Sequence, residues 1–264
     1  MPKDTAQTPQ EALEQAVAES RRVSTTGDIE VATYLEIAQG ERVRGGRPDR
    51  DTTEPETVII MDFGAQYTHL IARRVREANV FCEIVPHSAD GAVLDGKNVV
   101  GIILSGGPNS VYEEGAPLAP GWVFEAGVPI LGICYGMQAL AHQLGGKVTA
   151  GLEQEYGYAV IHRNDLTTEL FAGMDEASPV WMSHGDRIET LPTGFNSLAY
   201  SENSPIAAFG NDFGIYGIQF HPEVAHTPQG AKLLSNFVHK ICGASGDWTA
   251  GHFVTEAIDR IREQ

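Results

Sequence analysis

The sequence has no long apolar run and few basic residues. No stretch of its 264 residues approaches the roughly 18 consecutive apolar residues of a membrane-spanning helix, and the first residues contain no apolar core typical of a secretory signal. Lysine and arginine number 18 against 35 aspartates and glutamates, a formal net charge of −17. Such a charge disfavours binding to nucleic acid or to an anionic membrane. We therefore expect neither partner.

Cysteine is also scarce. The three cysteines, Cys82, Cys134 and Cys242, are too few and too scattered for a disulfide framework. No cluster of cysteine and histidine has the spacing of a zinc site. We therefore expect a protein of the reducing cytoplasm that binds no metal.

The chain divides into three segments of different character. Residues 1–55 combine helix-forming stretches with the charged segment "ERVRGGRPDRDTTEPE", which predicts an extension that is partly helical or disordered. Residues 56–243 have the length and apolar content of one principal domain. Residues 244–264 start a new amphipathic helix late in the chain, which predicts a linker and the first helix of a further domain that is missing here.

Short β-rich runs alternate with helical segments in the first part of the principal domain. The runs "TVIIMDF", "NVVGIIL" and "VPILGIC" are almost continuously apolar, as strands buried on both faces must be. Helical patterns follow in "GAQYTHLIARRVREAN" and "YGMQALAHQLGG". Later runs such as "KVTAGL" and "EYGYAVIHR" indicate an antiparallel extension. The predicted fold is α/β with three layers: a mostly parallel central sheet, helices on both faces and an antiparallel extension.

The stretch "GICYGMQ" places a cysteine between a buried strand and a helix. Gly132 and Gly136 stand two residues before and two residues after Cys134, the pattern of a nucleophile elbow with cysteine in place of serine. The glycines permit a sharp turn, and the amino terminus of the following helix favours the thiolate. A lone cysteine among apolar residues can equally be a packing residue, so the elbow alone leaves both interpretations open.

A thiolate nucleophile needs a base and a group that orients the base. His221 ends the strand-like run "IYGIQF" and opens "HPE", and Glu223 follows two residues later, within reach of the far nitrogen of the ring. His184 in "MSHGD" is a weaker alternative for the base. The pattern predicts a triad of Cys134, His221 and Glu223.

These motifs resemble those of a known family. "GICYGMQ" with "QFHPE" is similar to the class I, or triad, glutamine amidotransferases over roughly residues 57–243. The stretches "IIMDFGAQYTHLIARRVRE", "GIILSGGPNSVYEEGAP" and "WMSHGDRIETLP" further resemble the amidotransferase domain of glutamine-hydrolysing GMP synthases. The tail "GDWTAGHFVTEAIDRIREQ" resembles the start of the ATP-pyrophosphatase domain that follows in those enzymes.

The resemblance implies a reaction and a set of roles. L-Glutamine would be hydrolysed to glutamate and ammonia through a glutamyl thioester on Cys134. Backbone N–H groups of Gly107 and Tyr135 would hold the oxyanion, and the substrate-binding side chains would be those of Gln138, Ser183 and Asp186. A synthetase (ATP-pyrophosphatase) domain or subunit would be the partner, on which ammonia aminates XMP to GMP. ATP and Mg²⁺ are expected on that domain and no cofactor on this chain.

Other interpretations stay open at this point. The chain could be the amidotransferase subunit of another pathway, such as anthranilate or CTP synthesis, or a γ-glutamyl hydrolase-like enzyme without ligation. A binding module without chemistry would be expected to have lost part of the triad. The stretch "SGGPNS", Ser105 to Ser110, is similar to the phosphate loop of ATP pyrophosphatases. However, Asn109 replaces the aspartate of that loop, and prolines follow where a helix is needed, so an ATP site is disfavoured.

Overall fold

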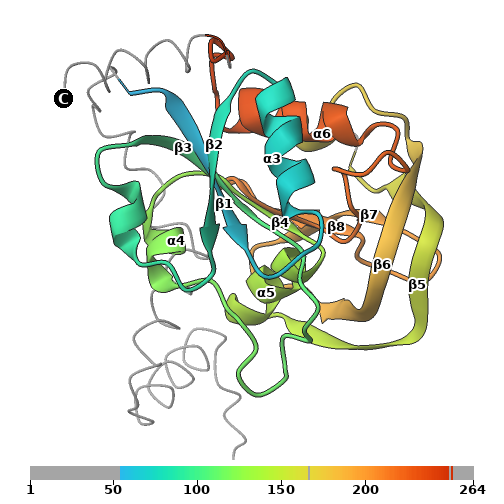
Figure 1. Ribbon diagram of the computed structural model, residues 1–264. Coiled ribbons are helices and arrows are strands. Elements are labelled where there is room, and N and C mark those ends of the chain that lie inside the picture. The colour runs from blue at the N-terminus through green and yellow to red at the C-terminus, as the bar shows by residue number, and fades with distance from the viewer. Residues whose placement is uncertain (1–53, 166, 250, 252–264) are drawn as a thin grey trace, which may run out of the picture.

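The computed structural model describes residues 54–165, 167–249 and 251 (Figure 1). The predicted extension of residues 1–55 lies almost entirely outside the described residues. The predicted first helix of a further domain, within residues 244–264, lies outside them as well from residue 252 onward.

One sheet of nine strands runs through the domain (Figure 1). In spatial order its strands are β2 (Phe81–Pro86), β1 (Glu56–Asp62), β3 (Asn98–Leu104), β4 (Ile130–Ile133), β9 (Ile215–Ile218), β8 (Ala208–Gly210), β7 (Asn196–Tyr200), β5 (Lys147–Arg163) and β6 (Ala177–Thr190). Pairing is parallel from β2 to β9 and antiparallel from β9 to β6. The predicted parallel sheet with an antiparallel extension is confirmed.

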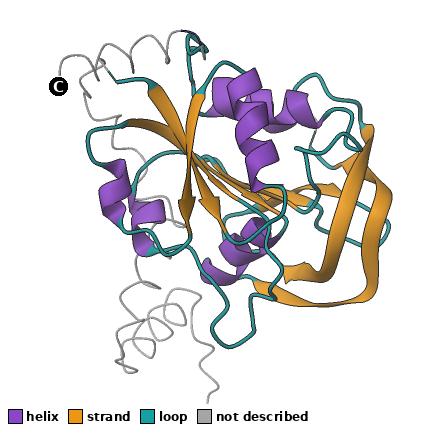
Figure 2. Cartoon of the chain, viewed as in Figure 1, coloured by secondary structure: helices purple, strands orange, loops and turns teal. Residues whose placement is uncertain are grey.

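Helices cover both faces of the parallel half (Figure 2). On one face lie α3 (Thr68–Glu77) and α6 (Gly230–Asn236), which continues as the π-helix Phe237–Ile241; on the other lie α4 (Gly121–Glu125) and α5 (Tyr135–Gln143). Short 3-10 helices occupy Gly91–Leu94 and Glu169–Phe171. The three predicted layers are therefore confirmed. No helix among residues 54–165, 167–249 and 251 is both long enough and apolar enough to cross a membrane.

The β1 strand explains why the sheet needs apolar residues in succession. Val58 and Ile60 pack in the core on the side of α3 and α6, whereas Ile59 and Met61 pack in the core on the side of α4 and α5. Side chains alternate between the two faces of a strand. A strand covered by helices on both faces must therefore be apolar at every position.

The carboxyl ends of the central parallel strands position the site. Ser105 directly follows β3, Cys134 directly follows β4, and Gln219 directly follows β9. Because the three strands are parallel neighbours, their carboxyl ends meet at one edge of the sheet. In open α/β sheets, this edge is where ligands bind.

The residues that follow Gly243 are attached to this domain as far as they are described. Ser245 donates hydrogen bonds from its backbone N–H and its hydroxyl to the carboxylate of Glu56, at 2.6 and 2.7 Å. The N–H of Trp248 donates to the carbonyl oxygen of Asn79 at 3.1 Å. These contacts hold the segment beside the start of β1.

Packing between β3 and the end of the π-helix leads to a first prediction. A Cβ atom on Gly101 would overlap the Sγ atom of Cys242 and lie 3.6 Å from the carbonyl oxygen of Pro129. We expect Gly101→Ala to lower the free energy of unfolding by about 1–3 kcal/mol, because overpacking forces its neighbours apart. In a double-mutant cycle, Cys242→Ala should offset part of that loss. Urea unfolding measures both effects.

The control is Gly121→Ala at the start of α4. A Cβ atom there would have only the Oε1 atom of Glu125 nearby, at 3.8 Å, and alanine favours a helix. Equal stability of Gly101→Ala and Gly121→Ala would contradict the packing described above.

Candidate active site

Cys134 lies on a strained turn between β4 and α5. Its φ is 53°, in the left-handed region, which costs a non-glycine residue of the order of 1–3 kcal/mol. A Cβ atom on Gly132 would lie 2.6 Å from the carbonyl group of Gly136. One on Gly136 would overlap the carbonyl oxygen of Leu104. Both glycines of the predicted elbow are therefore sterically required.

The structure brings the three predicted triad residues together. Cys134 interacts with the ring of His221 and raises the pKa of that ring, and Nδ1 of the ring lies 2.7 Å from Oε1 of Glu223. All three residues are buried. Burial lowers the pKa of His221, but hydrogen bonds with Cys134 and Glu223 outweigh burial and raise that pKa to about 10. The arrangement therefore stabilises a protonated imidazole beside the sulfur atom.

Further contacts hold the "HPE" turn in place. The hydroxyl of Thr227 donates to the carbonyl oxygen of His221 at 2.6 Å and accepts from the N–H of Trp181 at 3.1 Å. Nε of Arg74 donates to the carbonyl oxygen of Glu223 at 3.2 Å. Sequence reasoning did not identify Thr227, since its role depends on β6, which is distant in sequence.

The loop after β3 passes beside the cysteine and the histidine. A Cβ atom on Gly106 would lie 3.3 Å from Cε1 of His221 and 3.7 Å from Cβ of Cys134. The carbonyl oxygen of Ser105 accepts the N–H of Gly136 at 3.0 Å, which fixes the loop to the elbow. A side chain at Gly106 would therefore require the ring of His221 to shift by a few tenths of an ångström.

The two residues predicted to hold an oxyanion are neighbours. A Cβ atom on Gly107 would lie 3.2 Å from Cδ1 of Tyr135 and 2.9 Å from the carbonyl oxygen of Phe63. Tyr135 is the first residue of α5, and N–H groups at a helix amino terminus have no partner within the helix. The Gly107 segment therefore packs against the residue that directly follows Cys134.

Gln138 links the elbow helix to β6 and β9. Its Nε2 donates to the carbonyl oxygen of Asp186 at 3.1 Å and to Oε1 of Gln219 at 3.2 Å. Nε2 of Gln219 in turn lies 3.8 Å from Sγ of Cys134. Sequence reasoning missed Gln219, although it belongs to the "QFHPE" motif and is a polar residue directly after a buried strand.

The predicted substrate residues Ser183 and Asp186 lie on β6 near the cysteine. The carbonyl oxygen of Ser183 is 3.7 Å from Sγ of Cys134, and the side chain of Ser183 is exposed. Oδ1 of Asp186 accepts from the hydroxyl of Tyr112 at 2.7 Å. Sequence reasoning missed Tyr112, because no local pattern marks a tyrosine in a loop as the partner of a distant strand.

His184, the weaker alternative base, is engaged elsewhere. Nε2 of His184 lies 3.0 Å from Oε2 of Glu155, and Nδ1 lies 2.8 Å from the carbonyl oxygen of Asp186. Neither ring nitrogen is left to accept a proton from a thiol. His221 is therefore the better candidate for the base.

The structure also bears on whether this chain could hold an ATP site or a metal site. The loop that begins at Ser105 leads into α4 only at Gly121, so no helix amino terminus stands behind it as a phosphate site requires. Within the part of the chain that the structure describes, no group of three or more histidine, cysteine, aspartate or glutamate side chains could hold a metal ion.

The contact between His221 and Glu223 leads to a second prediction. The ordinary pKa of histidine is about 6.5, and in the folded protein that of His221 is raised to about 10. The protonated His221 ring therefore stabilises the folded protein. This contribution to the free energy of unfolding is complete below about pH 6.5 and is lost as the pH rises through about 10. We expect Glu223→Gln to lower the pKa of His221 and to shift this loss of stability to lower pH.

An NMR titration of the His221 ring and urea unfolding at several pH values measure the two effects. Glu114→Gln, in an exposed loop, is the matched control and should change neither. If Glu223→Gln and Glu114→Gln titrate alike, the carboxylate does not set the pKa of His221.

Comparison with known proteins agrees with this geometry. The family model described as "Glutamine amidotransferase class-I" matches residues 59–241. A GMP synthase (glutamine-hydrolyzing) from Dehalococcoides mccartyi strain CBDB1 is 52% identical over 236 residues, which are 89% of this chain and 44% of that protein. One from Thermomicrobium roseum is 54% identical over 209 residues, 79% of this chain and 39% of that protein. The chain thus spans less than half the length of these relatives.

A solved structure supports the same assignment. It is a protein from Thermoplasma acidophilum described as a candidate GMP synthase subunit, 31% identical with a TM-score of 0.65. The match covers 80% of this chain and 99% of that one. Since the family model covers more than half of the sequence and a relative of similar size shares the fold, the chain belongs to the class I glutamine amidotransferase family.

Proposed function

We propose that this chain is the glutamine-hydrolysing part of a GMP synthase. It hydrolyses L-glutamine to glutamate and ammonia, and the ammonia aminates XMP to GMP on an ATP-dependent synthetase domain or subunit. The observation that carries the proposal is the buried cluster of Cys134, His221 and Glu223 on the strained elbow. The assignment to the GMP pathway rests on the relatives named GMP synthase.

In the first step, Sγ of Cys134 attacks the carboxamide carbon of glutamine. The proton that the thiol gives up is already on His221 when the attack begins, and the electron pair of the carbonyl bond moves to oxygen. The imidazolium formed is stabilised by Glu223, whose Oε1 lies 2.7 Å from Nδ1. The raised pKa of His221 favours this proton transfer.

The oxyanion of the tetrahedral intermediate is bound by the backbone N–H groups of Gly107 and Tyr135. The packing of Gly107 against Tyr135, the residue that follows Cys134, supports this role, and the loss of one such donor typically costs roughly 10²–10³ in rate. The intermediate then collapses: the C–N bond breaks, His221 gives its proton to the departing nitrogen, and ammonia leaves. A glutamyl thioester remains on Cys134.

Water completes the reaction. His221 takes a proton from the water molecule as its oxygen attacks the thioester carbon. The C–S bond breaks, glutamate leaves, and the sulfur of Cys134 regains a proton from His221. Atoms and charge then balance, with one water consumed for each ammonia released.

The α-ammonium group distinguishes glutamine from a simple amide, and an acidic side chain is the natural partner for it. We assign this contact to Asp186, whose carboxylate binds the hydroxyl of Tyr112 in the structure described here. The exposed side chain of Ser183 contacts the same end of the substrate. The amide N–H groups of Gln138 already face Asp186 and Gln219, so its substrate contact is left to its carbonyl oxygen.

ATP and Mg²⁺ are assigned to the synthetase partner, and this chain is proposed to act in the cytoplasm without a cofactor of its own. Subunits of other pathways and γ-glutamyl hydrolase-like enzymes remain as alternatives, because they would also release ammonia from glutamine. Adding a separate ATP-pyrophosphatase chain with XMP and ATP separates these cases, since only the proposed function yields GMP.

The nucleophile supplies a third prediction. Cys134→Ala should reduce glutamine hydrolysis by roughly 10³-fold or more, because no thioester can form. Cys82→Ala is the matched control, since burial raises the pKa of the Cys82 thiol to about 11 and keeps it unreactive. Glutamate and ammonia release are measured for both variants. Full activity of Cys134→Ala would rule out covalent catalysis at this residue.

Recognition of the ammonium group supplies a fourth prediction. Asp186→Asn should raise KM for glutamine by roughly 10-fold or more, the cost of losing a hydrogen bond to a charged group, with a smaller change in kcat. Asp212→Asn, an exposed aspartate between β8 and β9, should leave both constants unchanged. If kcat falls while KM is unchanged in Asp186→Asn, this residue does not bind the substrate.

A further inference from the structure

The pairing of β5 with β6 is interrupted beside the substrate-binding residues. Ala150 pairs with Asp186, and the next pair along the strands is Glu155 with His184. Residues 151–154 therefore stand opposite Gly185 alone. The backbone ladder is locally disrupted there, although it continues on both sides. Side-chain contacts at this point therefore add to what positions the two strands.

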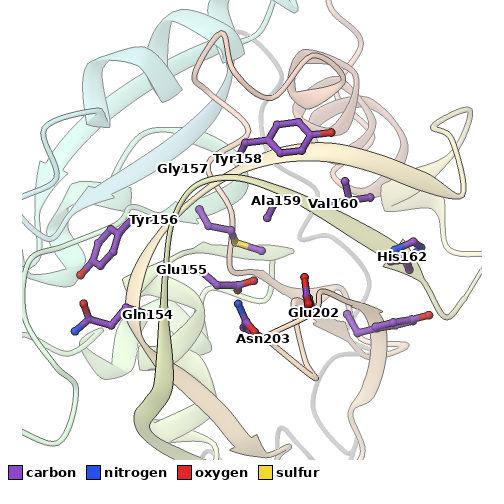
Figure 3. A pocket seen from close by; sticks show the side chains of 12 residues that line it. Gln154, Glu155, Tyr156, Gly157, Tyr158, Ala159, Val160, His162, Glu202 and Asn203 are labelled. Carbon is purple, nitrogen blue, oxygen red and sulfur yellow. The ribbon is translucent and has the colours of Figure 1, made fainter.

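The side chains of this first pair after the interruption form a buried contact. Nε2 of His184 lies 3.0 Å from Oε2 of Glu155, and both residues are more than nine-tenths buried. Glu155 also accepts the hydroxyls of Ser201 and Ser204, at 2.8 and 2.7 Å. Figure 3 shows the Glu155 side chain directed from β5 toward the turn that carries Glu202 and Asn203, which lies between these two serines.

The carboxylate of Glu155 is ionised. Burial raises its pKa, but hydrogen bonds from His184, Ser204 and Ser201 outweigh burial and lower that pKa to about 2. All of its close partners in these contacts are donors. The group is therefore an acceptor toward His184.

Both ring nitrogens of His184 consequently face acceptors. Nε2 faces the carboxylate of Glu155, and Nδ1 lies 2.8 Å from the carbonyl oxygen of Asp186. A neutral imidazole has one donor and one acceptor nitrogen, whereas the imidazolium has two donors. Only the cationic ring satisfies both contacts.

The carbonyl oxygen of Asp186 thus receives two buried donors. One is Nδ1 of His184 on β6, and the other is Nε2 of Gln138 on the elbow helix, at 3.1 Å. The two donors connect Asp186 to the Glu155 ion pair on one side and to the helix that begins after Cys134 on the other.

On the basis of the function proposed above, we propose that His184 is a positioning residue. As an imidazolium held by Glu155, it fixes the backbone of Asp186 so that the carboxylate of Asp186 meets the α-ammonium group of glutamine. A buried ion pair is a poor source of stability compared with apolar packing. The contact between His184 and Glu155 lies where the pairing of β5 with β6 is interrupted, next to Asp186. We therefore assign to it the positioning of Asp186.

The test compares two variants that each keep one donor. The carboxamide nitrogen of Asn lies close to the position of Nδ1, and that of Gln lies close to the position of Nε2. His184→Gln should lose the bond to Asp186 and raise KM for glutamine by roughly 10-fold or more, with a smaller change in kcat. His184→Asn should keep that bond and a KM closer to that of the wild type. His162→Gln, an exposed histidine on β5, is the control and should change nothing.

A loss of activity in the His184 variants could come from a misplaced Asp186 or from damage to the triad. Alkylation of Cys134 by iodoacetamide distinguishes these two causes. Iodoacetamide has no α-ammonium group, so its reaction with Cys134 should be unchanged in His184→Gln and His184→Asn. A fall in alkylation that parallels the loss of glutamine hydrolysis would overturn the proposal, as would a KM for His184→Gln equal to that of the wild type.

The charge of the His184 ring is tested by a measurement that does not depend on enzyme activity. In the wild-type protein at neutral pH, ¹⁵N NMR should show protons on both ring nitrogens of His184, and in Glu155→Gln the ring should lose one. A singly protonated ring in the wild type would overturn the proposal even if the His184 variants failed to fold. Absence of glutamine hydrolysis by the wild type, with a doubly protonated ring, would instead count against the proposed function.

Discussion

The strained turn at Cys134 is the constraint on which the rest of the site depends. A non-glycine residue with φ of 53° is stable only where its surroundings compensate the strain. The N–H of Cys134 donates to the carbonyl oxygen of Ile218 at 2.8 Å, and the N–H of Gly136 to that of Ser105 at 3.0 Å. These acceptors belong to β9 and to the loop after β3, the segments that also bring in His221 and Gly107. The bonds that hold the turn therefore also assemble the site.

The site contains two buried pairs of histidine and glutamate, His221 with Glu223 and His184 with Glu155. The two pairs differ in the group that faces the second ring nitrogen. The ring of His221 is bonded to Glu223 and interacts with the thiol of Cys134, a group that can give up its proton. The ring of His184 is bonded to Glu155 and to a backbone carbonyl, which has no proton to exchange. With the roles proposed above, the same pair of residue types would serve proton transfer in one place and positioning of the backbone in the other.

Local patterns in the sequence were enough to predict the parallel strands, the elbow and the contact between His221 and Glu223. Each depends on neighbours in the chain: continuous apolar runs, glycines around Cys134, and a separation of two residues. The antiparallel half was less predictable, because "KVTAGL" and "EYGYAVIHR" belong to the single long strand β5. The contact between Gln219 and Cys134 joins residues 85 apart, and that between Glu155 and Ser201 joins residues 46 apart. Such contacts follow from strand order and register, which no local pattern encodes.

Asp186 combines a fixed backbone with an exchangeable side chain. Its carbonyl oxygen is held by Gln138 and His184, both buried. Its carboxylate is bonded to the hydroxyl of Tyr112, a residue that is 49% exposed. A hydrogen bond open to water contributes little net stability, since water replaces either partner. The carboxylate can therefore exchange Tyr112 for a charged ligand without any movement of the backbone, as the proposed recognition of the α-ammonium group of glutamine would require.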